Sequence, residues 1–114
     1  MEPGTTITWE DFEKIDIRVG TIIDASEFPK AKKPAYQLTI DFGECGIKRS
    51  SAQITTLYSL QDLKGIQVIA VTNFPPKRIA DFTSECLVLG IYTENKDVVL
   101  LQPQQTVLNG MKIG

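Results

Sequence analysis

The strictest pattern in this sequence is the alternation of apolar and polar side chains from Tyr36 to Phe42. Every second residue in this run is apolar, and Gln37, Thr39 and Asp41 stand between them. A period of two is typical of a β-strand that buries one of its faces. The run therefore predicts a strand in a sheet that covers a hydrophobic core.

A second alternation begins at Ile15 and reaches Val19, where Gly20 interrupts it. A glycine inside a strand often marks a bulge or a tight bend at the corner of a barrel. We therefore expect a strand that continues to about Ala25 and bends at Gly20, so that it pairs with two neighbours.

The remaining elements are short and are separated by turns rich in glycine, proline and asparagine. Capping pairs, Thr8 with Asp11 and Ser59 with Asp62, predict an N-terminal helix of about two turns and a second short helix. Further strands are predicted at residues 47–54, 66–71, 85–91 and 98–101. We therefore expect an all-β fold, because a helix between strands 3 and 4 is usual in the five-stranded OB-fold barrel. The short N-terminal helix and the C-terminal β strands are additions to that barrel, and an open β-sandwich is the alternative.

The composition argues against catalysis. The chain of 114 residues is 42% hydrophobic and 23% charged, as expected of one globular domain, and it contains no histidine. Without histidine it has no Ser-His or Cys-His nucleophile and no His-ligated metal site. Carboxylate pairs such as Glu10 with Asp11 stand in no recognisable catalytic motif. We expect a protein that is not an enzyme and that needs no cofactor and no metal.

Cys45 and Cys86 are expected to be free thiols. The first residues, Met1 to Gly4, have neither the basic region nor the apolar run of an export signal. No stretch approaches the roughly 20 apolar residues of a membrane-spanning helix. These features favour a cytoplasmic protein, in whose reducing surroundings disulfides are rare.

Charge is unevenly distributed along the chain, although the formal net charge is only −2. Residues 1–29 carry seven acidic and two basic side chains, whereas residues 30–49 carry five basic and two acidic ones. A polyanion would therefore meet a local patch rather than a long-range attraction. The basic residues form either a strip that contacts phosphates or a solvated turn. They are Lys30, Lys32, Lys33, Lys48 and Arg49.

A polar strand and an exposed aromatic residue suggest a binding groove. Residues 50–53 are small or polar where a core strand would carry valine or isoleucine. Strands 2 and 3 form the recognition surface of OB-folds, so this strand predicts either a ligand-binding groove or a plain exposed strand. Phe74 precedes two prolines in a predicted loop, where it serves as a ligand contact or as a cap on the barrel.

Several blocks of the sequence resemble a known family. Residues 16–20 (DIRVG) and 31–36 (AKKPAY) are similar to the tRNA-binding domain appended to some methionyl-tRNA synthetases. Residues 46–55 (GIKRSSAQIT), 73–80 (NFPPKRIA) and 84–90 (SECLVLG) resemble the CsaA family more closely. The resemblance extends over residues 12–113.

The resemblance implies an OB-fold homodimer that acts as an export-related chaperone for unfolded polypeptides or preproteins, with tRNA as the alternative ligand. The N-terminal helix and the C-terminal strand with its tail resemble the elements that build the dimer in this family. Ile7, Trp9 and Phe12 exceed what a short helix needs for its own packing, so we expect them at the dimer interface, and ordinary core residues are the alternative. We expect Arg18 and Glu85 either to pair with each other or to contact ligand. The candidate groove consists of Arg18, Lys32, Lys33, Lys48, Ser50, Ser51, Ala52, Gln53, Asn73, Phe74, Ser84 and Glu85.

Overall fold

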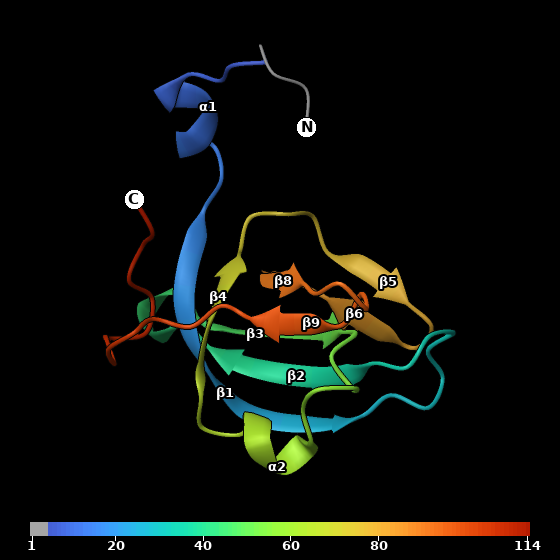
Figure 1. Ribbon diagram of the computed structural model, residues 1–114. Helices are drawn as coiled ribbons and strands as arrows, with labels where there is room; N and C mark the ends of the chain where they lie inside the picture. The colour runs from blue at the N-terminus through green and yellow to red at the C-terminus, as the bar shows by residue number, and fades with distance from the viewer. Residues whose placement is uncertain (1–4) are drawn as a thin grey trace.

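Five antiparallel strands form a nearly closed barrel in the computed structural model, which describes residues 5–114 (Figure 1). Their order in the sheet is β3-β2-β1-β4-β7. The bounds are β1 (Ile17–Glu27), β2 (Tyr36–Asp41), β3 (Ile47–Ala52), β4 (Gln67–Val71) and β7 (Leu87–Val88). A short helix lies between β3 and β4, so the predicted OB-fold is confirmed.

The long strand β1 bends so that it pairs with two neighbours. Its first part pairs with β4 and its second part with β2, and the register shifts between Ile22 and Asp24. The predicted bulge at Gly20 is therefore wrong, because the irregularity lies at Ile23, three residues further along. Gly20 is required by packing instead, since a Cβ atom there would lie 2.6 Å from the Ile40 side chain and 2.7 Å from the Phe42 ring.

The alternating residues of β2 form the centre of the hydrophobic core. Leu38, Ile40 and Phe42 are completely buried, and each contributes roughly 1.5–3 kcal/mol by leaving water. Tyr36 is also buried, and its hydroxyl donates a hydrogen bond of 2.9 Å to the carbonyl of Tyr58. The predicted buried face of this strand is confirmed.

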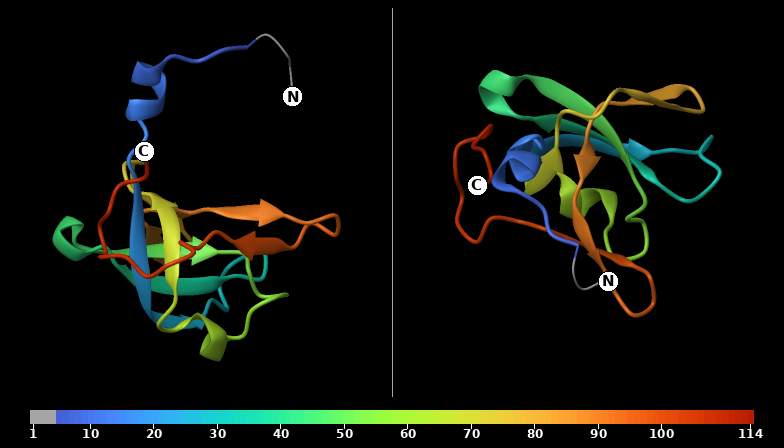
Figure 2. Two further views of the ribbon diagram at one scale, coloured as in Figure 1. Left: turned by 60° about the vertical axis from the view of Figure 1, so that its left-hand side comes forward. Right: turned by 90° about the horizontal axis from the view of Figure 1, so that it is seen from above.

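Both predicted helices form, and each begins with the expected capping box. Thr8 and Asp11 cap α1 (Trp9–Glu13), and Ser59 and Asp62 cap α2 (Leu60–Leu63). The first helix has five residues and is shorter than the two turns predicted. It stands away from the barrel at the start of β1 (Figures 1 and 2). Among the described residues, neither helix is long and apolar enough to cross a membrane.

Two small hairpins flank the barrel. The first joins β5 (Lys77–Ile79) to β6 (Phe82–Ser84), within a segment that the sequence predicts as a loop. The second joins β8 (Gly90–Tyr92) to β9 (Val98–Leu100). The single strand predicted at residues 85–91 is therefore divided into β7 and β8.

The C-terminal segment, residues 110–113, lies alongside the first part of β1. The Val19 amide donates to the carbonyl of Met111 (3.0 Å), and the Ile113 amide donates to the carbonyl of Ile17 (2.9 Å). The Gln67 side chain holds the preceding loop through a 2.7 Å hydrogen bond to the carbonyl of Val107. The tail therefore adds a short paired stretch to the barrel.

Candidate binding groove

A cavity of about 480 Å³ lies beside the outer face of β3, and we call it the apolar cavity. It brings together five predicted site residues from β3, from the β4–β5 loop and from the end of β6. It is lined by Ser51, Gln53, Phe74, Pro75, Lys77, Ile79, Ser84, Glu85, Cys86 and Leu87. Phe74 remains 54% exposed, so its ring is accessible to a ligand.

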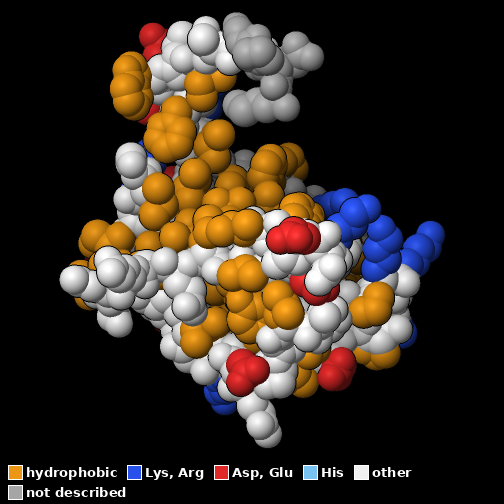
Figure 3. Space-filling model, in the orientation of Figure 1, with side chains coloured by type: hydrophobic (Ala, Val, Ile, Leu, Met, Phe, Trp, Pro, Cys, Tyr) orange, Lys and Arg blue, Asp and Glu red, His pale blue; other side chains and the backbone are white. Residues whose placement is uncertain are grey.

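A second cavity of about 580 Å³, which we call the basic cavity, adjoins the first. The two share Ser51, Gln53, Lys77 and Ile79, and together they form the binding groove. Figure 3 shows lysine and arginine side chains gathered over β5 at this side of the molecule. The basic cavity is lined by Lys30, Ala31, Lys32, Lys33, Ala35, Ser51, Gln53, Lys77, Arg78, Ile79 and Ala80. In OB-folds, the loop between strands 1 and 2 and the loop between strands 4 and 5 border the ligand site, and this groove has the same surroundings.

The β5–β6 hairpin is attached to β3 by contacts of Arg49. The Glu85 amide donates to the carbonyl of Arg49 (2.7 Å), and the Arg49 amide donates to the Glu85 carboxylate (3.0 Å). The Arg49 guanidinium lies over the ring of Phe82, which is buried and packs against Phe28. These contacts fix the hairpin as one wall of the groove. They also show that Glu85 does not pair with Arg18.

Only alternate residues of the polar strand face the groove. Ser50 is 1% exposed, and its hydroxyl donates a 2.9 Å hydrogen bond to the carbonyl of Cys86. Ala52 is likewise buried in the core. Their placement corrects the expectation that both face ligand, since a strand turns successive side chains to opposite faces. Ser51 and Gln53 face the groove.

Asn73 and Arg18 fix the start of β1 and lie outside the binding groove. The Asn73 side chain accepts a hydrogen bond from the Asp16 amide (3.0 Å) and donates one to the carbonyl of Lys14 (2.7 Å). Arg18 donates to the Asp16 carboxylate (2.9 Å) and to the carbonyl of Gly110 (3.0 Å). Both placements correct the predicted groove, because neither residue lines either of its two cavities.

The same junction holds Asp16 in its charged form. A hydrogen bond of 2.7 Å from the Thr72 hydroxyl is the main cause that lowers the pKa of Asp16, and Arg18 lowers it further. Each partner donates to the carboxylate, and such bonds favour ionisation. Asp16 therefore serves as an anchor for the segment between α1 and β1.

Lys48 is separated from Lys30, Lys32 and Lys33 by the register of the sheet. Lys48 lies opposite Ile40, whereas the loop that carries Lys32 and Lys33 joins β2 at Tyr36, opposite Ala52. The predicted strip of five basic residues therefore does not form. Lys77 and Arg78 complete the basic cavity instead. Neither was predicted as a site residue, because the β5–β6 hairpin that carries them was not predicted.

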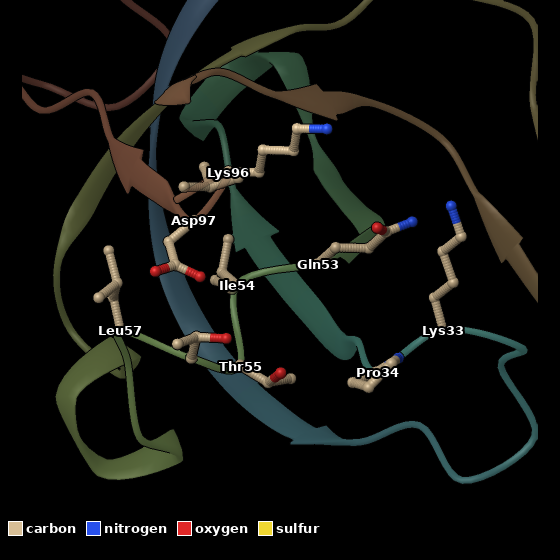
Figure 4. A pocket seen from close by; sticks show the side chains of 10 residues that line it. Lys33, Pro34, Gln53, Ile54, Thr55, Leu57, Lys96 and Asp97 are labelled. Atoms are coloured by element: carbon tan, nitrogen blue, oxygen red, sulfur yellow. The ribbon is translucent and has the colours of Figure 1, made fainter. Parts of the chain in front are cut away.

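Gln53 connects the groove to two smaller cavities. One of about 240 Å³ lies between the β1–β2 loop, the β8–β9 turn and residues 53–57, which follow β3. Figure 4 shows Gln53 between Lys33 and Lys96 at this cavity. The other, of about 340 Å³, lies between residues 51–54, at the end of β3 and just after it, and residues 87–90. The barrel is open at this gap, so one end of β3 is accessible.

The residues predicted for a dimer interface lie on or beside α1, away from the binding groove. Ile7 is 68% exposed and Trp9 is 83% exposed, whereas Phe12 is half-buried. Figure 3 shows hydrophobic side chains from α1 downward across β4 and β8. Ile91 and Tyr92 are exposed apolar side chains on β8, in the β8–β9 hairpin. An apolar surface of this extent is typical of a site of association.

Comparison with known families places most of the chain in one family. Residues 17–112 match the family model described as "Putative tRNA binding domain". A methionine–tRNA ligase of Nitrosomonas eutropha is 38% identical over 109 residues, which cover 95% of this chain and 15% of the ligase. A methionine–tRNA ligase of Methanococcoides burtonii is 34% identical over 99 residues, which cover 87% of this chain and 14% of the ligase. The chain therefore spans only a small part of the length of these relatives.

Solved structures point to one branch of that family. The crystal structure of the chaperone CsaA from Bacillus anthracis has a TM-score of 0.91 and 55% identity, with 96% of this chain and all of that chain covered. The CsaA chaperone from Picrophilus torridus has a TM-score of 0.89 and 53% identity, with the same coverage. The chain therefore belongs to the tRNA-binding-domain family and is a CsaA-like member of it.

Proposed function

We propose that this chain is a non-enzymatic, CsaA-like chaperone that binds extended segments of unfolded or export-bound polypeptide as a cytoplasmic homodimer. The observation that carries the proposal is the apolar cavity, in which Phe74, Ile79 and Leu87 surround an accessible part of β3. Extended peptides bind to such sites through main-chain hydrogen bonds and side-chain pockets. The CsaA chaperones with 55% and 53% identity support the same activity.

A test is the binding of a permanently unfolded polypeptide, such as reduced and carboxymethylated α-lactalbumin, followed by fluorescence anisotropy. We expect binding that Phe74→Ala weakens about tenfold, because exposed aromatic anchors commonly contribute more than 1 kcal/mol. The matched control is Ile47→Ala, since Ile47 is similarly exposed but borders no cavity described above. Equal affinity of Phe74→Ala and the wild-type protein would contradict the proposal.

A second candidate function is tRNA binding, which the basic cavity and the family match favour. Lysine contacts to phosphates release counterions, so tRNA affinity would fall steeply between low and physiological salt. Lys32→Glu combined with Lys33→Glu would then abolish binding, whereas Phe74→Ala would have a smaller effect through lost stacking. Tight, salt-sensitive tRNA binding without binding of the unfolded polypeptide would replace the chaperone proposal.

A further inference from the structure

The accessible edge of β3 has a main-chain acceptor in the binding groove. The Arg49 amide and carbonyl both bond to Glu85, and the Ser51 amide donates to the Ser84 hydroxyl (3.3 Å). These bonds show that alternate residues of β3 direct their main-chain groups away from β2. The Ser51 carbonyl therefore points outward as well, and it has no hydrogen-bond partner among residues 5–114.

The two cavities share Ser51 as a lining residue and differ in chemistry. The apolar cavity offers the Phe74 ring and the Leu87 side chain, which are 54% and 48% exposed. The basic cavity offers Lys32, Lys33 and Lys77. A ligand that extends across Ser51 would therefore place one group among apolar side chains and another among ammonium groups.

The ammonium groups of the basic cavity are largely uncompensated. Within the described part of the chain, Lys30 pairs with Asp81 at 3.3 Å, whereas Lys32, Lys33 and Lys77 have no carboxylate within ion-pair distance. Arg78 is held by the carbonyl of Ala80 at 3.1 Å. The three lysines thus provide positive charge that a bound carboxylate would neutralise.

We propose that the groove selects extended polypeptide segments in which an apolar residue and an acidic residue stand two positions apart. The segment donates a main-chain hydrogen bond to Ser51, inserts its apolar side chain beside Phe74, and places its carboxylate over the three lysines. Residues i and i+2 of a strand lie on one face and are about 6.7 Å apart, whereas adjacent residues face opposite sides. This selectivity rests on the proposed chaperone function and adds the chemistry of the client to it.

A polypeptide fits the groove better than RNA does. Single-stranded nucleic acids bind where aromatic rings stack on successive bases. Phe74 is the one exposed aromatic ring that lines the groove in the described residues, because Phe82 is buried beneath Arg49. Aliphatic side chains and a main-chain acceptor are instead the features that bind extended peptides.

The test uses labelled peptides in a Gly-Ser background, measured by fluorescence anisotropy with the full chain. We expect Leu-Ser-Glu to bind about tenfold tighter than Leu-Ser-Lys and tighter than Leu-Glu-Ser, in which the two side chains are adjacent. The triple variant Lys32→Glu, Lys33→Glu and Lys77→Glu should reverse the order of the first two peptides. Lys64→Glu is the control, because Lys64 is exposed and lies outside the groove.

A second arm tests the main-chain contact. N-methylation removes a main-chain N–H donor from the peptide, and successive N–H groups of a strand point to opposite sides. Methylation of every second residue should therefore weaken binding, whereas methylation of the residues between them should not. Equal binding of all peptides would overturn the selectivity and leave the chaperone proposal intact. If no peptide and no unfolded protein binds, while an RNA oligonucleotide does, both proposals fail together.

Discussion

The Arg49 guanidinium lies 4.2 Å from the ring centroid of Phe82. The pair connects the outer face of β3 to the β5–β6 hairpin, and Phe82 also packs against Phe28 with a centroid distance of 5.4 Å. One wall of the binding groove is therefore held by a cation over an aromatic ring as well as by main-chain hydrogen bonds.

Arg49→Met should lower the free energy of unfolding by about 0.5–1 kcal/mol, because it removes a cation–π contact between an exposed arginine and a buried ring. Urea denaturation measures the change. A double-mutant cycle with Phe82→Leu should give a coupling of about 0.5–1 kcal/mol. Additive effects of the two substitutions would show that the contact contributes nothing of its own.

Gly20→Ala should destabilise the barrel by about 1–3 kcal/mol, because the new methyl group would overlap with Ile40 and Phe42 at the centre of the core. Thermal denaturation measures the change. Gly114→Ala is the control, since nothing lies within 4 Å of a Cβ atom there. A Gly20→Ala protein as stable as the wild type would contradict the packing explanation for this glycine.

The two thiols should react differently with a thiol reagent at pH 8. Cys45 is exposed and should be labelled in the folded protein, whereas Cys86 is buried and should be labelled only when the chain unfolds. Labelling with and without denaturant counts the accessible thiols. Two reactive thiols in the folded protein would contradict the burial of Cys86.

Cys86 should also make stability depend on alkaline pH. Burial is the main cause that raises the pKa of this thiol from 9.0 to about 11. Above pH 9 the unfolded chain loses this proton while the folded chain keeps it, so the folded state loses about 1.4 kcal/mol per pH unit up to about pH 11. Urea denaturation from pH 8 to 10.5 should show a shallower slope for Cys86→Ala than for the wild type. Equal slopes would contradict the raised pKa.

The proposed homodimer should depend on α1. Light scattering should give about twice the chain mass of 12.7 kDa for the wild type, and Trp9→Asp should shift the protein towards monomer. Trp9 is 83% exposed, so the substitution should leave the barrel folded. Glu10→Gln on the same helix is the control. A monomeric wild type at micromolar concentration would exclude this interface.

Local patterns predicted the elements that local forces determine. The alternation of β2 and the capping boxes of Thr8 and Ser59 depend on residues a few positions apart, and the structure confirms them. The roles of Asn73 and Arg18 depend on partners 57 to 92 positions away, which no local pattern reveals.

The groove was predicted only in part for the same reason. Ser51 and Gln53 line it, but the inward direction of Ser50 follows from strand register and from a hydrogen bond to Cys86. The contribution of Lys77 follows from a three-residue strand that is too short to give a periodic signal. Residues of short hairpins are therefore the ones that sequence patterns are least able to identify.

The placement of α1 and of the C-terminal segment has a consequence for how such a domain is built into larger proteins. Both lie on the opposite side of the barrel from the β5–β6 hairpin and the β1–β2 loop (Figures 1 and 2). A catalytic domain joined at α1 or at the C-terminal segment would leave the binding groove unobstructed. In the methionine–tRNA ligases of Methanococcoides burtonii and Nitrosomonas eutropha, the matching region is 14% and 15% of the length, so there the region is one part of a much longer protein.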